Sequence, residues 1–168
     1  MLANLREVLA YAEKNECAIG AFNTPNLECI RAVIDGAEKL NVPVIISHAQ
    51  LHEYAAPLEV IGPVMVLLAK SAKVPVCVHL DHCEDLDYMA RALEIGFTGV
   101  MYDGSLLPYK ENVANTIKAV TMAKMYGASV EAELGTLAAR EGGTEAVPAG
   151  PVYTDPDLAK QFVDDTKI

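Results

Sequence analysis

The chain has 168 residues, of which 52% are hydrophobic and 21% are charged, as in a globular protein with a buried core and unlike a disordered one. The net charge of −10 argues against a general nucleic-acid binder, because attraction to a phosphate backbone needs clustered Lys and Arg. The four cysteines form no CxxC pair and no apolar run is long enough to span a bilayer. We therefore expect a cytoplasmic protein with free thiols and no membrane partner, folded as a single domain, 1–168.

Helices and strands are predicted to alternate along the whole chain. The first helix carries Leu2, Leu5 and Val8 on one face, and Asn26 is expected to cap the second. Gly62 and Pro63 are expected to kink or start the third helix. The predicted strands are 18–23, 42–49, 74–82, 97–103 and 128–134, and the later helices are 26–40, 57–72, 86–95, 108–126 and 155–165, the last of them after a loop at 135–151.

Two architectures fit this alternation. Continuous apolar strands separated by amphipathic helices imply parallel β/α units, in a doubly wound open sheet or in part of a (β/α)8 TIM barrel. No GxGxxG motif follows the first strand, which removes the dinucleotide-binding form of the open sheet. About five β/α units fall short of a closed barrel, which usually takes about 250 residues.

A polar group stands at the C-terminal end of every predicted strand. An active-site face built from several strand ends is what a barrel enzyme needs, whereas an open sheet gathers its ligands at one switch point. The sequence therefore favours an α/β fold of the (β/α)8 TIM-barrel type, here incomplete. The strand-end residues are Asn23, Ser47, His48, Asp81, His82, Asp103 and Glu133.

The stretch VCVHLDHCEDLD, residues 76–87, concentrates these groups. Asp85 and Asp87 are expected to favour the N-terminus of the following helix, and Cys83 to fill apolar space. For His82, a loop histidine and a metal ligand are equally open interpretations. Asp103, directly before Gly104, fits a turn residue as well as a site residue.

The residues at three predicted strand ends together offer nitrogen and oxygen ligands for a metal. His82, Asp103 and Glu133 together suit a divalent metal. Glu131 and Glu133 share one strand face, so we expect one to serve the site and the other to be a paired structural carboxylate lower on the strand.

The motifs HLDHCEDLD, MYDGS and VEAELG, in this order, resemble those of the class II (zinc-dependent) ketose-bisphosphate aldolases, a family that includes fructose- and tagatose-bisphosphate aldolases. AFNTPNLE and YTDPDLAKQFV are similar to that family as well, so the resemblance covers nearly the whole chain. It implies a TIM barrel, a bound Zn²⁺ and a second divalent or monovalent cation as a further occupant. The implied reaction is reversible aldol cleavage of a phosphorylated ketose to dihydroxyacetone phosphate and glyceraldehyde 3-phosphate.

The resemblance also implies a role for each matching residue. Asp81 matches the catalytic aspartate that handles the proton of the reacting hydroxyl, and Glu141 matches the loop glutamate that moves a proton of dihydroxyacetone phosphate. Asn23 and Ser47 match substrate-binding positions. The metal-binding positions are His82, Asp103 and Glu133.

This chain departs from the family pattern in two places. Ala138 and Ala139 stand where the family usually has glycines, which puts the role of Glu141 in doubt. The family's two other zinc histidines and its phosphate-binding loops lie beyond residue 168, and no histidine follows His82. We therefore expect a fragment with little or no activity alone, in preference to a half-barrel completed by a partner, and a homo-oligomer for the full-length protein.

Two further hypotheses remain open. A non-catalytic metal-binding or interaction half-barrel would use the same polar cluster without the reaction. A barrel enzyme of other chemistry, such as an isomerase, would keep the fold and give up the motif argument.

Overall fold

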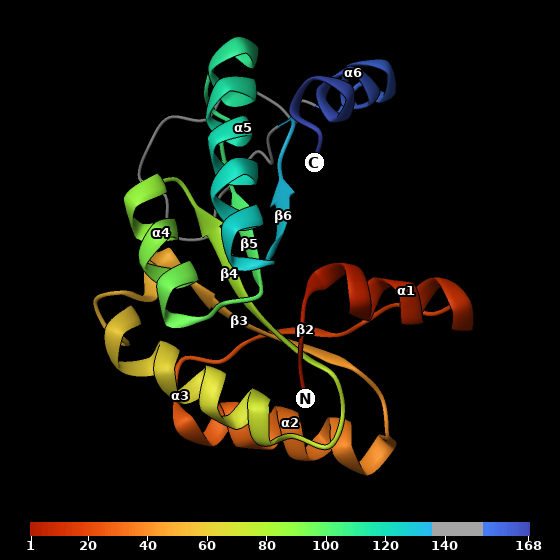
Figure 1. Ribbon diagram of the computed structural model, residues 1–168, viewed down its shortest axis with the longest axis vertical. Coiled ribbons are helices and arrows are strands. Elements are labelled where there is room, and N and C mark those ends of the chain that lie inside the picture. Colours follow the sequence, from red (N-terminus) through yellow and green to blue (C-terminus); the bar gives the residue numbers. More distant parts are fainter. Residues whose placement is uncertain (136–152) are drawn as a thin grey trace.

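The computed structural model describes residues 1–135 and 153–168, where helices and strands alternate as predicted (Figure 1). The strands are β1 (Leu2–Ala3), β2 (Ala21–Asn23), β3 (Val44–Ala49), β4 (Val76–Cys83), β5 (Gly99–Tyr102) and β6 (Ser129–Ala132). The helices are α1 (Leu5–Asn15), α2 (Leu27–Leu40), α3 (Leu58–Ser71), α4 (Leu86–Ile95), α5 (Tyr109–Tyr126) and α6 (Pro156–Thr166), with a short 3-10 helix, η1 (Gln50–His52), after β3.

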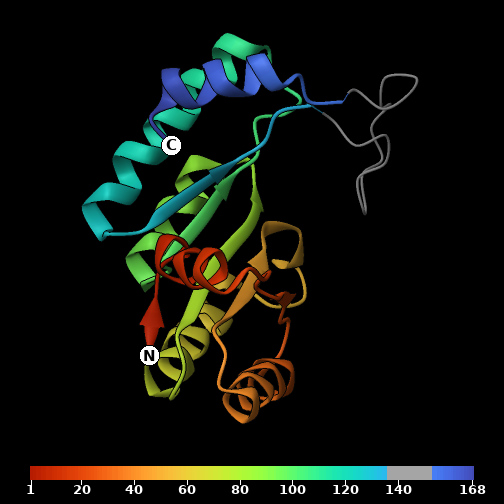
Figure 2. The same ribbon diagram turned by 90° about the vertical axis from the view of Figure 1, so that its right-hand side faces the viewer.

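The described strands form one parallel sheet in the order β2-β3-β4-β5-β6, and β1 pairs with Val76 and Cys77 at the start of β4. The order follows the chain without a reversal, whereas a doubly wound sheet reverses its strand order at a switch point. Helices α2, α3, α4 and α5 follow the outside of the arc, and α1 lies on its other side (Figures 1 and 2). The fold is therefore α/β and forms an incomplete (β/α)8 barrel, as the sequence predicted.

The core divides between the two faces of the sheet. The larger cluster lies between α2–α5 and the outer face, where β4 contributes Val76, Val78 and Leu80. The smaller cluster lies under α1 on the inner face and includes Cys77 of β4 with Leu5 and Val8 of the helix. The alternation of β4 thus leaves its odd-numbered positions, up to Asp81, facing the inside of the arc.

The first two elements differ from their predicted form. Leu2 belongs to β1 rather than to the first helix, because Asn4 caps α1: its Oδ1 accepts from the backbone N–H of Glu7 at 3.0 Å. Strand β2 is exposed along its length, although a buried strand was expected, and Phe22 is 49% exposed. In the described part of the chain β2 has a neighbour only at β3, so it forms one edge of the sheet.

Helix α3 is continuous across the predicted kink, with Pro63 inside it. The residue before it, Gly62, is fully packed: a Cβ added there would lie 3.1 Å from Cε2 of Phe97 and 3.3 Å from Cγ2 of Ile95. Gly62 therefore allows α3 to approach the end of α4 closely, and it does not start the helix, which begins at Leu58.

Several predicted helix boundaries are confirmed. Asn26 caps α2 through the backbone N–H of Cys29, Gly96 and Gly127 end α4 and α5 in the left-handed conformation, and Pro156 begins α6. All four cysteines are free thiols. In residues 1–135 and 153–168, no helix combines the length and apolarity needed to cross a membrane.

Candidate metal centre

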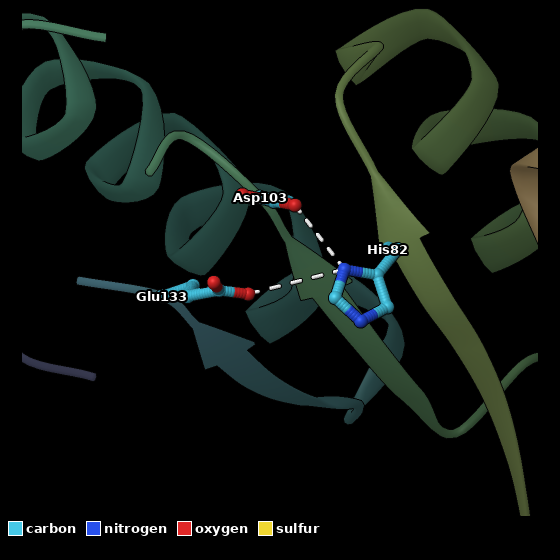
Figure 3. Close-up of side chains that lie close together, drawn as sticks. All are labelled: His82, Asp103 and Glu133. Atoms are coloured by element: carbon cyan, nitrogen blue, oxygen red, sulfur yellow. Dashed lines mark hydrogen bonds and ion pairs between the residues drawn. The ribbon is translucent and has the colours of Figure 1, made fainter. Parts of the chain in front are cut away.

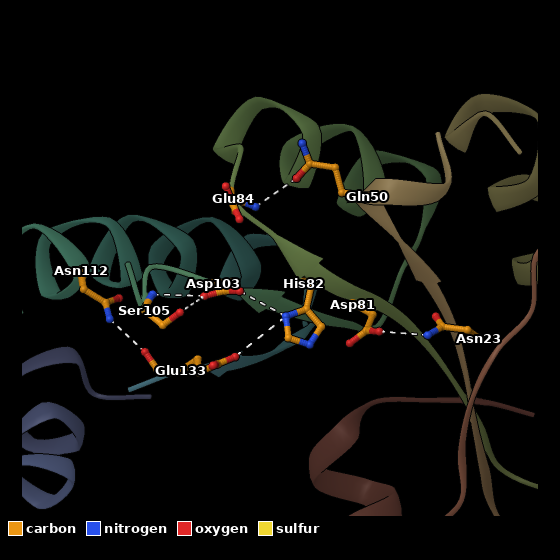
Figure 4. Close-up of polar contacts among 9 residues, drawn as sticks. All are labelled: Asn23, Gln50, Asp81, His82, Glu84, Asp103, Ser105, Asn112 and Glu133. Carbon is orange, nitrogen blue, oxygen red and sulfur yellow. Dashed lines mark hydrogen bonds and ion pairs between the residues drawn. The ribbon is translucent and has the colours of Figure 1, made fainter. Parts of the chain in front are cut away.

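The carboxyl end of β4 presents two consecutive ionisable residues on the same side of the sheet (Figure 4). A regular strand would send Asp81 and His82 to opposite faces. Here Leu80 pairs with Val100 and Cys83 with Tyr102, so β4 carries one residue more than β5 over this interval. This β-bulge includes His82, which has a φ of 45°, in the left-handed region.

The bulge determines what each side chain contacts. His82 turns toward β5 and β6, whereas Cys83, which strict alternation would point inward, returns to the outer core and is fully buried there. Cys83 is therefore the apolar filler that the sequence predicted. Asp85 likewise has its expected role, because its carboxylate caps α4 by accepting from the backbone N–H groups of Asp87 and Tyr88.

Three strand ends meet at the His82 ring (Figure 3). The Nδ1 atom of His82 lies 3.1 Å from Oδ2 of Asp103, which follows β5, and 3.9 Å from Oε2 of Glu133, which follows β6. The three candidate ligand atoms all lie within 4.8 Å of one another. Asp103 is buried, while the His82 side chain is 50% exposed, so the cluster is open on the histidine side.

The charges around His82 favour a cation. Burial by itself would lower the pKa of the imidazole. The hydrogen bond to Asp103 and the negative charges of Asp81, Asp103 and Glu133 outweigh that effect and hold the pKa of His82 above its ordinary value. Surroundings that stabilise a positive imidazole also stabilise a metal cation, since both carry positive charge among carboxylates.

The two carboxylate oxygens of Asp103 have separate partners, one in the turn and one in the candidate centre. Its Oδ1 accepts from the backbone N–H of Ser105 at 3.1 Å and from the Ser105 hydroxyl at 2.7 Å, which is the turn. Its Oδ2 faces the ring of His82 in the candidate centre.

Gly104 lets helix α5 come close, because a Cβ there would lie 2.4 Å from Oδ1 of Asn112. Asn112 in turn donates to the backbone carbonyl of Glu133 at 2.9 Å.

The remaining predicted residues are only partly brought together. Asn23 donates from Nδ2 to Oδ2 of Asp81 at 3.2 Å, so β2 holds the carboxylate beside His82 (Figure 4). Ser47 is buried on β3, where its backbone carbonyl accepts from the N–H of Thr24. Glu141 lies outside the described residues.

The second glutamate of β6 has a separate partner. Oε2 of Glu131 lies 3.3 Å from Nε2 of the buried His79, and the hydrogen bond from His79 lowers the pKa of Glu131. Glu131 is therefore the paired carboxylate lower on the strand, as the sequence predicted. Gly99 makes room for this pair, since a Cβ there would lie 2.8 Å from Nδ1 of His79.

The cluster fits a divalent metal by ligand type and by spacing. Imidazole nitrogen and carboxylate oxygen bind Zn²⁺ at about 2.0–2.2 Å, which places neighbouring ligands of a tetrahedral ion about 3.3 Å apart. The separations of 3.1 Å and 3.9 Å around Nδ1 of His82 lie on either side of that value. The three candidate ligand atoms lie within 4.8 Å of one another, so His82, Asp103 and Glu133 could hold such an ion once their side chains adjust to that spacing.

Three supporting residues were not predicted from the sequence. Ser105 and Asn112 hold Asp103 and Glu133, and Gln50 accepts the backbone N–H of Glu84 next to the bulge at 3.0 Å. The Asp-Gly-Ser sequence at 103–105 is a turn signal that could have pointed to Ser105. Nothing local in the sequence points to Asn112 or Gln50, because their partners are distant along the chain.

A parallel β/α arc with a histidine and carboxylates at the carboxyl ends of its strands is the arrangement of an incomplete (β/α)8 barrel with a candidate metal site at that end. The sequence model of the family described as "Fructose-bisphosphate aldolase class-II" matches residues 3–168. The chain belongs to this class II aldolase family, as the three motifs indicated.

The chain is similar to named aldolases over nearly its whole length. It is 36% identical over 170 residues to the "Probable fructose-bisphosphate aldolase" of Bacillus subtilis (strain 168), covering 99% of this chain and 59% of that protein. It is 37% identical to the fructose-bisphosphate aldolase of Giardia intestinalis, covering 99% of this chain and 51% of that protein. Among solved structures, the YdjI aldolase of Escherichia coli K12 superposes with a TM-score of 0.85 at 35% identity, covering 99% of this chain and 59% of that chain.

Proposed function

We propose that the complete protein containing this chain catalyses reversible aldol cleavage of a ketose 1,6-bisphosphate, fructose or tagatose, to dihydroxyacetone phosphate and glyceraldehyde 3-phosphate. Family membership supports the reaction class and the phosphorylated sugar substrate. The observation that carries the proposal is the cluster of His82, Asp103 and Glu133 beside Asp81, at the carboxyl ends of three adjacent strands. The chain spans 59% of the Bacillus relative, so the activity is assigned to the complete protein.

We assign a Zn²⁺ ion to the cluster, with a second divalent or monovalent cation as a further occupant. When bound, the ion would supply Lewis-acid polarisation of a substrate carbonyl oxygen. The chain's own contribution is to hold the ligands: Ser105 orients Asp103, and the bulge directs His82 toward both carboxylates.

Asp81 is assigned as the general acid and base. It precedes His82 directly, and the hydrogen bond from Asn23 fixes its orientation. A carboxylate held at a reacting hydroxyl can take and return its proton. Asn23 and Ser47 are assigned to the substrate side of the site, and Glu141 to the proton of dihydroxyacetone phosphate.

The assembly around the site is also part of the proposal. Residues 1–168 form a single, truncated TIM-barrel domain, supported by the continuous sheet and the shared core of β3, β4 and β5 with helices α2–α5. The family resemblance supports a homo-oligomer for the full-length protein, and the free cysteines fit a cytoplasmic enzyme.

The test is an aldol cleavage assay on the complete gene product, with fructose and tagatose 1,6-bisphosphate as alternative substrates and dihydroxyacetone phosphate as the detected product. We expect activity that a chelator removes and Zn²⁺ restores. Asp81→Asn should lower kcat by about 10²- to 10⁴-fold, the usual range for a general acid or base. Asp87→Asn is the matched control and should keep wild-type activity, because Asp87 lies in the exposed first turn of α4.

One observation favours a second candidate, a non-catalytic metal-binding or interaction half-barrel. Among the described residues the candidate centre contains one histidine and two carboxylates, on a sheet with an exposed edge at β2. Stoichiometric metal binding and a stable oligomer, without cleavage of either bisphosphate by the complete protein, would replace the aldolase proposal with this one.

A further inference from the structure

We infer that Gln50 is a positioning residue for the metal-binding histidine His82. The inference rests on the proposed function, because it takes the cluster at His82 to be a metal site. Gln50 contributes no atom to that cluster: it lies in η1 after β3, and Figure 4 shows it on the other side of β4 from the His82 ring. It acts through the backbone of the bulge.

The position of the His82 ring depends on the bulge. A φ of 45° is a conformation that non-glycine residues adopt only where their surroundings require it. If His82 relaxed to an ordinary strand conformation, alternation would turn its side chain away from Asp103 and Glu133 and toward the outer core. The contacts that hold the bulge therefore hold the ligand.

Within residues 1–135 and 153–168, two hydrogen bonds to other parts of the fold hold the end of the bulge, one on each side of β4. On the β5 side, the backbone N–H of Asp103 donates to the carbonyl of Cys83 at 2.8 Å. On the β3 side, the backbone N–H of Glu84 donates to Oε1 of Gln50 at 3.0 Å. Gln50 thus supplies from a side chain the acceptor that a neighbouring strand would otherwise supply.

A partly buried polar network fixes the segment that carries Gln50. The Tyr88 hydroxyl of α4 has one proton, which it donates to Oε2 of Glu53 at 2.7 Å. The hydroxyl oxygen must therefore accept from Nε2 of His48, 2.9 Å away. Glu53 also accepts the backbone N–H of Leu58 at the start of α3. Residues on both sides of η1 are thereby tied to α3 and α4, so Gln50 starts from a fixed backbone.

Removing the acceptor oxygen of Gln50 should make the position of the His82 side chain less restricted while the side chain itself remains. Residues that orient metal ligands typically contribute about 10- to 100-fold to metal affinity. Gln50→Ala should therefore weaken Zn²⁺ binding by about that factor. Gln50→Glu keeps an acceptor oxygen at the same reach, so it should bind Zn²⁺ at least as tightly as the wild type.

The experiment uses the complete gene product, stripped of metal, and has two readouts that do not require activity. The first is Zn²⁺ affinity by competition with a chromophoric chelator. The second is hydrogen exchange of the Glu84 backbone amide in the metal-free protein. Gln161→Ala, in the exposed part of α6, is the matched control and should change neither.

We expect a slowly exchanging Glu84 amide in the wild type and in Gln50→Glu, and fast exchange with weaker Zn²⁺ binding in Gln50→Ala. Unchanged Zn²⁺ affinity in a folded Gln50→Ala variant would overturn the inference. Unprotected exchange of Glu84 in the wild type would also overturn it, even if Gln50→Ala fails to fold. A protein that shows the expected Zn²⁺ effects but cleaves no bisphosphate would contradict the proposed function alone.

Discussion

At the scale of single residues, the candidate centre depends on a bulge of one residue in β4 that brings Asp81 and His82 to the same side of the sheet. Asp81 and His82 were expected to act side by side, yet strand alternation alone would separate them. The bulge that unites them depends on pairing between β4 and β5, which no local pattern encodes. The separation of Glu131 from Glu133 was predictable, because residues two apart share a face at different depths.

Because Glu131 and Glu133 have different partners, the same substitution at each of them makes a matched test of metal binding. Glu133→Gln should lower Zn²⁺ affinity by at least about 100-fold, more than the usual effect of an orienting residue, because it alters a proposed ligand. Glu131→Gln makes the same chemical change two residues away, next to His79, and should leave Zn²⁺ affinity within about twofold. Equal losses in both variants, measured by chelator competition, would show that general negative charge rather than ligation holds the ion.

At the scale of elements, helix boundaries were predictable where local rules decide them and were not predictable where packing decides them. Asn26 acts through its side chain on a backbone N–H three residues away, and Gly96 and Gly127 act through their own backbone, so all three were predicted correctly. Gly62 was expected to kink or start the helix, but α3 begins at Leu58, and Gly62 packs against Phe97, 35 positions further along the chain. The exposure of β2 likewise depends on which strands lie beside it.

The two helical glycines of α2 and α3 should respond oppositely to a larger side chain. Gly62→Val should lower the free energy of unfolding by about 1–3 kcal/mol, because the added atoms meet Phe97 and Ile95. Gly36→Ala should raise it by about 1 kcal/mol, since a Cβ there meets nothing within 4 Å and alanine favours a helix. Urea unfolding of both variants measures the difference. Stabilisation by Gly62→Val would contradict the close packing of α3 on α4.

The hydrogen-bond network of His48, Tyr88 and Glu53 should make the free energy of unfolding depend on pH. Burial is the main cause that lowers the pKa of His48, and His52 adds to it, while Glu53 and Glu59 act in the opposite direction. The unfolded chain takes up a proton near pH 6.5, which the folded protein resists. Neutral His48 contacts Tyr88 through Nε2. The stabilisation that depends on this neutral form is therefore fully present above about pH 6.5, the pKa of an unfolded histidine. It is lost as the pH falls through the pKa of His48 in the folded protein, which is lower.

His48→Gln removes this titration and keeps a donor for Tyr88. We expect the urea midpoint of the wild type to fall more between about pH 7.5 and about pH 5.5 than that of the variant. Parallel curves for the two proteins would mean that His48 does not titrate differently in the folded and unfolded states.

At the scale of the whole molecule, the sheet is an arc rather than a closed barrel. Its described edges are β2 and β6, and the chain spans 59% of the Bacillus relative that it matches along 99% of its own length. The family and the barrel type could be predicted because three separate motifs and the strand-end polar groups agree. The curvature and the exposure of the edges could not, because both depend on which strands are present.

Purified 1–168 should therefore show little or no aldol cleavage, while the complete gene product cleaves its bisphosphate. The reason is that the described centre provides one histidine and two carboxylates, and the resemblance places the other zinc histidines beyond residue 168. Cleavage assays on both proteins at equal concentration test this. Robust cleavage by 1–168 alone would contradict it.

The most direct test of the central claim is anomalous X-ray scattering at the zinc absorption edge, on crystals of the complete protein prepared with Zn²⁺. We expect a strong anomalous peak between the His82 ring and the carboxylates of Asp103 and Glu133, and no such peak in crystals of His82→Ala. Zinc bound elsewhere, with His82 still hydrogen-bonded to Asp103 and no peak between them, would show that this cluster is a structural ion pair and not a metal centre.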